Sequence, residues 1–460
     1  MTATANASAG HPGDHIADQV VARIERLPTS AWHVKVRIIV GVATFFDAFD
    51  ALAIASVLPA IVPLWKLTPA QIGFLISAGF LGQLVGALLF GWVSERYGRL
   101  IAMRWSIAIF AGMSLVCAAA WDYSSLVLFR AAQGVGLGGE VPVAATYISE
   151  LTKAKGRGRF VLLYEVVFPI GLVGASLVGL WVVPNLGWQY MFVLGAIPAI
   201  LVFVLQRLVP ESPRWLAARG RHAEAEVAIS RMERETEKAT GKPLPAPAPG
   251  IATHVGRGSW ADLFGPRYLR RTLVVWVIWF SAYLVNYGLV VWLPTIYRIV
   301  YHLPLETSLQ YGLITQAVGL IGTLTCAFAI DRVGRRTWFA LAFAGAALAL
   351  ISLGLAGADS AERVVVHVSI AFLFVSSINL GVYLYTPELY PTRARAIAVG
   401  TASAWLRFAS MIGPTVVGLM VGSGLASVFV AFGTVAAIAA LVTALFAIET
   451  KGRVLEEVSP

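Results

Sequence analysis

The chain has 460 residues, of which 58% are hydrophobic and only 13% are charged, and its formal net charge at pH 7 is +10. Soluble globular proteins carry about a quarter charged residues, so this composition excludes an ordinary soluble domain and indicates a membrane protein. A positive net charge can indicate a nucleic-acid partner, and the positions of the basic residues along the chain test this possibility.

The first 36 residues are polar and show no cleavable signal peptide. Within them Ile16, Val20, Ile24 and Leu27 recur at helical spacing, which predicts a short amphipathic helix. Such a helix lies on the membrane surface or packs against a cytoplasmic domain, and the sequence leaves both alternatives open.

Twelve apolar runs of roughly 20 residues follow, each long enough to cross a hydrocarbon core of about 30 Å. Because only helices and closed barrels satisfy every backbone group in lipid, and the alternation of a barrel is absent, these runs predict helices. The expected fold class is an all-α integral membrane protein with twelve transmembrane helices in two six-helix bundles. The runs cover approximately residues 38–64, 71–93, 101–120, 124–148, 161–183, 190–208, 272–296, 310–330, 338–356, 364–386, 397–420 and 425–447.

One long polar break separates six spans from six. It begins with the helix-like PESPRWLAARGRHAEAEVAISRMERETEKA and ends with the Pro-rich linker PLPAPAPG. Five segments are therefore expected: a cytoplasmic N-terminal segment with the amphipathic helix (1–36), an N-terminal bundle (37–208), a cytoplasmic linker with helices (209–271), a C-terminal bundle (272–448) and a cytoplasmic tail (449–460).

The basic residues are distributed unevenly across the membrane. With the N-terminus inside, 30 of the 35 Lys and Arg residues fall on the inner side. Lys66, Arg298 and Arg363 lie outside, and Arg130 and Arg407 lie within spans. This asymmetry follows the positive-inside rule, so both termini are expected on the cytoplasmic side of the inner (plasma) membrane. It also accounts for the net charge without a nucleic-acid partner.

The two halves carry matching basic loops. SERYGRL between spans 2 and 3 recurs as IDRVGRR between spans 8 and 9, and ELTKAKGRGR after span 4 is echoed by ELYPTRAR after span 10. The offsets are nearly equal, 236 residues from Glu95 to Asp331 and 238 residues from Glu150 to Glu388. They predict a duplicated six-helix unit, and transporters built from such repeats bind substrate near the midplane between the halves.

These motifs resemble those of the major facilitator superfamily over essentially the whole chain. GWVSERYGRL is similar to the family's loop signature, with Glu95 where Asp is usual, and RAAQGVGLGG resembles its fourth-helix motif. PESPRWL and the RGR after span 4 are similar to the sugar-porter and organic-ion-transporter branches. We expect the basic loops to act as cytoplasmic latches, with plain topology anchoring as the alternative. The latch residues are Glu95, Arg96, Gly98, Arg99, Glu150, Arg157, Arg159, Asp331, Arg332, Arg335, Glu388, Arg393 and Arg395.

Span 1 places Asp47 and Asp50 where an unpaired charge costs at least a few kcal/mol. At about 1.5 Å rise per residue, Asp50 and Arg130 of span 4 lie at comparable depth. The two aspartates, three residues apart, are expected to share a helix face. We expect Asp50, with Asp47, to accept a proton and to exchange pairing with Arg130; a static ion pair is the alternative. The resemblance places Asp50 where sugar porters carry a proton-binding Asp.

Two glutamates form a second buried group. Glu165 stands where sugar porters typically have a sugar-binding Gln, which weakens a hexose assignment, and its role is either proton coupling or structure. Glu140 is either functional or structural. In the structural alternative it hydrogen-bonds the small-residue interface of Gly134, Gly138 and Gly139.

Arg407 lies near the middle of span 11, and no acid on that helix neutralises it. A guanidinium binds carboxylate bidentately, so Arg407 is a natural receptor for an anionic substrate. The string RFASMIGP also resembles the organic-ion transporters, whose anion-transporting members carry an Arg here; pairing with Asp47 or Glu165 is the alternative. Aromatic walls with a few polar groups suit a small aromatic ligand. The expected substrate-binding residues are Arg407, Tyr287, Asn286, Asn379, Tyr383, Trp292 and Tyr283.

The sequence therefore predicts a proton-coupled importer of a small organic anion, such as nicotinate or a benzoate derivative, working by alternating access. A sugar or polyol symporter is the alternative, and a non-transporting membrane sensor is an alternative of another class. An enzyme is not expected, since the seven histidines show no metal-ligand spacing and no nucleotide-binding Gly loop is present. The expected partners are the substrate, protons and membrane lipids, with no cofactor, no metal and a monomeric state.

Overall fold

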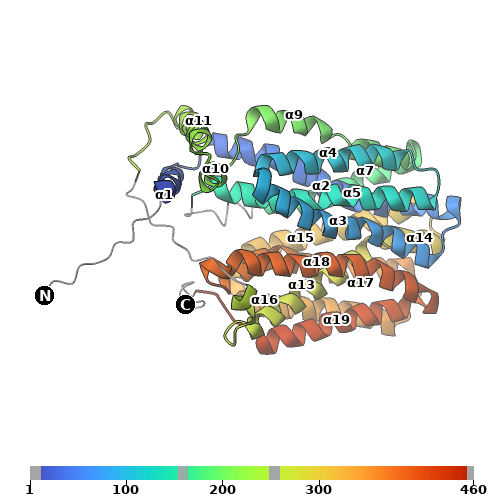
Figure 1. Ribbon diagram of the computed structural model, residues 1–460. Helices are drawn as coiled ribbons and strands as arrows, with labels where there is room; N and C mark the ends of the chain where they lie inside the picture. The colour runs from blue at the N-terminus through green and yellow to red at the C-terminus, as the bar shows by residue number, and fades with distance from the viewer. Residues whose placement is uncertain (1–11, 154–159, 161–163, 248–259, 453–460) are drawn as a thin grey trace.

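The computed structural model describes residues 12–153, 160, 164–247 and 260–452. Within this part of the chain the regular structure is helical, and the long helices run side by side in two groups (Figure 1). Helices of the first half, blue to green, form one group, and helices of the second half, yellow to red, form the other. The expected all-α membrane fold is confirmed.

The first half begins with α1 (Pro12–Glu25), which precedes the long helices. Its spanning segments are α2 (Ala31–Trp65), α3 (Pro69–Tyr97), α4 (Arg99–Ala118), α5 (Tyr123–Leu151), α7 (Val167–Asn185) and the consecutive pair α8 (Gln189–Gly195) and α9 (Ala199–Leu208). Between the halves lie α10 (Pro213–Ala218), α11 (His222–Thr240) and α12 (Trp260–Phe264).

The second half repeats this arrangement. Its spanning segments are the pair α13 (Leu269–Val290) and α14 (Leu293–Ile299), then α15 (Leu305–Val333), α16 (Arg335–Leu355), α17 (Ala361–Glu388), α18 (Thr392–Met420) with the short 3₁₀ turn η1 (Val421–Ser423), and α19 (Leu425–Phe446). Helices α1, α10 and α11 lie together beyond one end of the long helices (Figure 1). We call this end of the molecule the linker side.

Eleven helical segments of the described residues are long and apolar enough to cross a membrane. The twelfth span is α5, which is 29 residues long and less apolar because it carries Arg130, Gln133 and Glu140. Six spans therefore precede the linker helices and six follow them, in agreement with the predicted twelve-helix fold.

Helices α3 and α5 approach each other closely through glycines. A Cβ atom added to Gly82 would lie 2.0 Å from the carbonyl oxygen of Ala131, and one added to Gly134 would lie 2.1 Å from the carbonyl oxygen of Gly79. Small residues of this kind let two membrane helices pack backbone against backbone. This contact holds α5, and with it Arg130 and Glu140, against the rest of the first bundle.

Helix α1 packs against the linker helices, one of the two alternatives that the sequence left open. Val20 and Ile24 are buried on its apolar face. On its polar side Arg23 forms ion pairs of 2.6 Å with Glu226 and with Glu233 of α11. Arg26 pairs with Glu233 as well. The apolar face of α1 and two of its arginines are therefore used in docking on the linker helices.

The docking of α1 is expected to depend on pH. Burial raises the pKa of Glu233, but hydrogen bonds from Arg23 and Arg26 outweigh it and lower that pKa below its ordinary value of 4.5. Stability from a carboxylate with a lowered pKa is present above the unfolded-state pKa and is lost as pH falls through the folded-state value. Hydrogen-exchange protection of α1 should hold from neutral pH down to about 4.5 and decrease below it.

The matched control is Glu233→Gln, which should show at pH 7 the weak protection that the parent protein reaches only in acid. Equal protection of α1 in the parent protein at pH 7 and pH 3.5 would show that these ion pairs do not hold the helix in place.

Candidate functional site

A cavity lies between the two groups of helices, lined by α2, α3, α5 and α7 from the first half and by α13, α15, α17 and α18 from the second. Its volume is about 110 Å³. For comparison, an engineered apolar cavity of about 150 Å³ admits benzene. The space between the halves is therefore on the scale of a single small ring.

Arg407 of α18 lies on the wall of this cavity and is only 9% exposed. Its Nη1 donates to the side-chain oxygen of Gln83 at 2.7 Å, and its Nη2 donates to the carbonyl of Gly138 at 3.3 Å. Both acceptors are uncharged and belong to the opposite half of the chain. The structure thus gives the guanidinium neutral partners, and not an ion pair with Asp47 or Glu165.

Several polar atoms of the cavity wall are buried without a hydrogen-bond partner among the described residues. They are Asp47 Oδ1, Gln316 Nε2, Asn379 Oδ1 and Arg407 Nε, and all four residues line the cavity. A buried polar group left unpaired costs about 1–3 kcal/mol, so such groups normally meet a ligand or ordered water. The wall therefore offers both donors and acceptors to whatever occupies the cavity.

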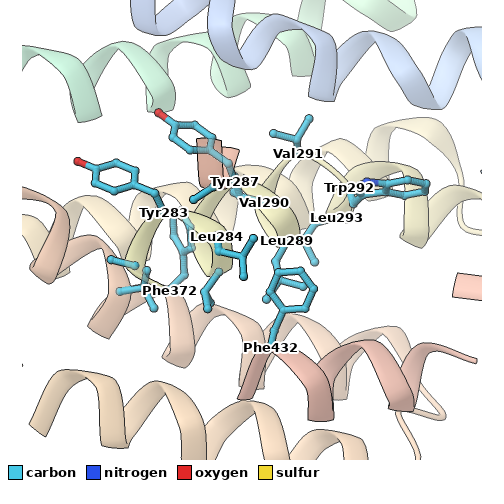
Figure 2. Packing of buried hydrophobic residues seen from close by; sticks show 14 of the residues in the cluster. Tyr283, Leu284, Tyr287, Leu289, Val290, Val291, Trp292, Leu293, Phe372 and Phe432 are labelled. Carbon is cyan, nitrogen blue, oxygen red and sulfur yellow. The ribbon is translucent and has the colours of Figure 1, made fainter. Parts of the chain in front are cut away.

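Tyrosines from α13 supply the aromatic part of the wall. The rings of Tyr283 and Tyr287 are 6.2 Å apart and nearly parallel, with an interplanar angle of 18°. Figure 2 shows both side chains pointing from α13 toward the helices of the first half, whereas Leu284 and Leu289 do not point that way. Asn286, Asn379 and Tyr383 line the cavity too, as expected for these candidate substrate-binding residues.

Trp292 does not line this cavity, so the structure does not bring it together with the other predicted substrate-binding residues. Its side chain is fully buried, and its Nε1 donates to the carbonyl of Pro414 at 3.0 Å. Figure 2 shows the ring lying away from Tyr283 and Tyr287. Because α13 ends at Val290 and α14 begins at Leu293, Trp292 sits in the turn between two helices and not on the face of α13 that carries the tyrosines.

Asp47 and Asp50 are three residues apart on α2, but their carboxyls have different surroundings. Asp47 lines the cavity, but Asp50 does not. The Oδ1 of Asp50 accepts from the Ser114 hydroxyl at 3.2 Å, on α4. Residues three apart on a helix differ by about 60° in direction, and here that angle separates the cavity from the interior of the bundle.

Arg130 lies beside Asp50, in agreement with the comparable depth in the membrane that was predicted for the two residues. Its Nη1 donates to the backbone carbonyl of Asp50 at 3.3 Å and to the side-chain oxygen of Gln133 at 2.6 Å. The predicted pairing of the guanidinium with the Asp50 carboxylate is therefore not what this conformation contains. Gly195 of α8 makes room for the carboxylate, since a Cβ atom there would lie 2.0 Å from Asp50 Oδ1.

Glu165 and Glu140 also differ in position. Glu165, two residues before α7, lines the cavity. Glu140 is fully buried, and the Thr44 hydroxyl donates to its two oxygens at 3.1 and 3.3 Å. The predicted structural partner of Glu140 was the glycine interface of its own helix, and this is wrong: Gly138 faces the α3 backbone, while Glu140 faces α2.

In the first half, three of the predicted latch residues meet at Arg99, at the start of α4. Its guanidinium lies 2.9 Å from Glu150 at the end of α5 and 2.8 Å from Glu95 at the end of α3. Gly98 turns the chain here with φ +117°. A further carboxylate, Glu211, accepts from the backbone N–H groups of Arg99 and Leu100, which satisfies unpaired donors at the N-terminus of α4.

The second half has the same construction around Arg335 at the start of α16. Its guanidinium lies 3.1 Å from Glu388 and 2.7 Å from Asp331. Gly334 turns the chain with φ +103°. Glu449 accepts from the backbone N–H groups of Arg335 and Arg336, as Glu211 does in the first half.

Among the other latch candidates, Arg96 and Arg332 form no ion pair with these two clusters in the described part of the chain. Arg96 and Arg332 are exposed, and Arg395 donates to the carbonyl of Tyr390 at 3.4 Å. Arg157, Arg159 and the side chain of Arg393 lie outside the described residues. The latch function itself stays a prediction.

The sequence interpretation missed two groups of residues. Glu211 and Glu449 are separated by 238 residues, the same offset as Glu150 and Glu388, so the repeat could have revealed them. Gln83 and Gln316 were missed, although Asn286 and Asn379, which carry the same amide group, were predicted to bind substrate. An amide in an apolar run is the signal that could have found them.

The model of the sugar (and other) transporter family matches residues 40–460. The chain belongs to this family. It is a multi-pass membrane transporter of the major facilitator superfamily, which confirms the resemblance seen in its loops. In fold, it is similar to the crystal structure of a D-xylose-proton symporter, with a TM-score of 0.70 and 20% identity over 92% of this chain and all of the other.

Two relatives of the chain are named as transporters of small organic molecules. The transporter is 34% identical over 457 residues to the niacin transporter NiaP of Acinetobacter baylyi, covering 95% of this chain and 99% of that protein. It is 27% identical over 409 residues to the 4-hydroxybenzoate transporter PcaK of the same organism, covering 87% and 88%.

Proposed function

We propose that the transporter imports a small organic anion together with protons, and that this anion is an aromatic carboxylate of the nicotinate or benzoate type. The observation that carries this proposal is Arg407, a guanidinium on the wall of a ring-sized central cavity with only uncharged protein partners. A carboxylate is the ligand that supplies the missing charge and matches the two-pronged geometry of guanidinium.

The tyrosines of the cavity wall support an aromatic ring in the substrate. Tyr283 and Tyr287 present two nearly parallel rings to the cavity, and Tyr383 lines it from α17. Aromatic faces beside a few fixed polar groups suit a flat ligand. The names of the relatives NiaP and PcaK, a niacin and a 4-hydroxybenzoate transporter, point to the same class of substrate.

Proton coupling is proposed through Asp47 and Glu165 at the cavity, with Asp50 and Arg130 behind it. An anion entering an inside-negative cell is opposed by about 2.3 kcal/mol per charge per 100 mV, and a proton moving with it cancels that charge. We also propose that the linker side and both termini face the cytoplasm. The latch residues would open and close the cytoplasmic side during alternating access, and the transporter would work as a monomer.

Uptake into proteoliposomes tests the proposal. With an inward proton gradient, labelled nicotinate or 4-hydroxybenzoate should accumulate above its external concentration, and a protonophore should abolish that accumulation. Unlabelled xylose should not compete. Uptake that is indifferent to the proton gradient would refute coupling, and absence of uptake for both acids would refute the substrate class.

A sugar or polyol is the second candidate. It is favoured by the amide groups of the wall, since Gln83, Gln316, Asn286 and Asn379 are the kind of side chains that hydrogen-bond hydroxyls. Proton-driven uptake of xylose with no competition from either acid would decide for this candidate. Ligand binding without any uptake would decide for a non-transporting sensor.

A further inference from the structure

Glu140 of α5 is a fully buried carboxyl that does not line the cavity. The hydroxyl of Thr44 on α2 bonds to its oxygens and also to the hydroxyl of Tyr164. Thr44 and Tyr164 are 0% exposed as well. These three side chains form one hydrogen-bonded chain, which we call the Glu140 cluster.

The Glu140 cluster contains no cation. The charged groups that act on Glu140 are the carboxyls of Asp47 and Glu165. The arginines of the neighbouring helices have other partners: Arg37 of α2 lies over the ring of Phe160, Arg130 of α5 bonds to Gln133, and Arg407 of α18 bonds to Gln83 and to the carbonyl of Gly138. Burying a carboxylate without a cation costs several kcal/mol. A neutral Glu140 carboxyl avoids this cost.

The Glu140 cluster lies directly behind the wall of the cavity, at its acidic end. Thr44 is one helical turn from Asp47, and side chains three apart on a helix are neighbours. Val141 and Glu165, which line the cavity, are next in sequence to Glu140 and Tyr164. On α2, Thr44 lies between Asp47 and the end of the helix at the linker side, which begins at Ala31.

We propose that Glu140 is a proton-binding site through which the cavity carboxyls exchange protons with the linker side. This inference rests on the proposed function, since it requires that transport be coupled to protons. In the step that we assign to it, the neutral carboxyl of Glu140 releases its proton to water on the linker side, and the carboxylate left behind takes the proton of the Asp47 carboxyl. One proton moves in all, from Asp47 to water.

The geometry also separates Glu140 from substrate binding. Arg407, Tyr283 and Tyr287 reach the cavity, but Glu140 does not. Replacing the Glu140 carboxyl by a group that cannot ionise should therefore leave the substrate able to bind and to cross the membrane. It should stop only the release of the proton. Equilibrium exchange of labelled for unlabelled substrate needs no proton release, whereas net uptake driven by a proton gradient needs it in every cycle.

The test compares these two activities in proteoliposomes with nicotinate as the probe. Glu140→Gln, which preserves shape and neutrality, should lower proton-driven net uptake at least 10-fold and leave equilibrium exchange within twofold. Glu140→Asp, which keeps an acid, should restore part of the net uptake. Tyr147→Phe is the matched control, because it removes a buried hydroxyl of α5 that bonds to the carbonyl of Pro210, outside the Glu140 cluster, and it should keep net uptake within threefold.

Each other outcome overturns the inference. Normal net uptake in Glu140→Gln would show that no proton passes through this residue. Equal loss of net uptake and exchange in the Gln and Asp variants would show a structural role. Failure of the proposed function is distinguishable, since the parent protein would then show no proton-driven nicotinate uptake at all.

Discussion

Replacing Arg407 by alanine is expected to lower the affinity for an aromatic carboxylate by roughly 30-fold to 5,000-fold, the usual cost of truncating one partner of a buried charge pair. The guanidinium is 9% exposed and has only neutral protein partners, and the residues that line the cavity include no second Lys or Arg to replace its charge. Substrate-induced stabilisation of the purified protein and the KM of uptake both measure this loss.

Two control variants make the result specific. Arg407→Lys keeps the charge and loses the planar fork, so it should fall between the parent protein and the alanine variant. Arg363→Ala removes the same charge from an exposed pair with Asp359, which should leave affinity unchanged. Unchanged affinity for nicotinate and 4-hydroxybenzoate in Arg407→Ala would contradict the anion site.

A second large effect is expected for Gly134→Val, which should prevent the close packing of α3 and α5. The first added carbon alone would lie 2.1 Å from the carbonyl oxygen of Gly79 and 3.0 Å from the Cα of Gly82, and both obstacles are backbone. Overpacking a well-packed interior costs about 1–3 kcal/mol when side chains can shift, and more is expected where only the backbone can move. The variant should give little monodisperse protein and a lower unfolding temperature.

The matched control for this prediction is Gly112→Val on α4, where an added Cβ meets nothing within 4 Å. Both variants add the same atoms to a glycine in a membrane helix, so the change in helix propensity is the same. The two variants differ only in what the added atoms contact. Equal yield and unfolding temperature in the two variants would show that α3 and α5 do not pack at the separation described.

The order of the spans, the duplication and the family follow from the sequence alone. Lipid admits only segments whose backbone is satisfied internally, so the length and apolarity of each run determine where a helix crosses. The equal offsets of Glu95–Asp331 and Glu150–Glu388 express a repeat that needs no coordinates. Arg407 could be singled out for the same reason, because any charge at the midplane requires a function or a partner.

The tertiary structure decided which way each polar side chain faces. Asp47 reaches the cavity while Asp50 faces α4, Glu140 bonds to Thr44 of α2, and Trp292 is buried in the turn before α14. Depth along a helix is set by counting residues, but direction depends on how each helix is rotated against its neighbours. That rotation is fixed by contacts between distant segments, such as the glycine packing of α3 on α5, and a one-dimensional pattern does not contain them.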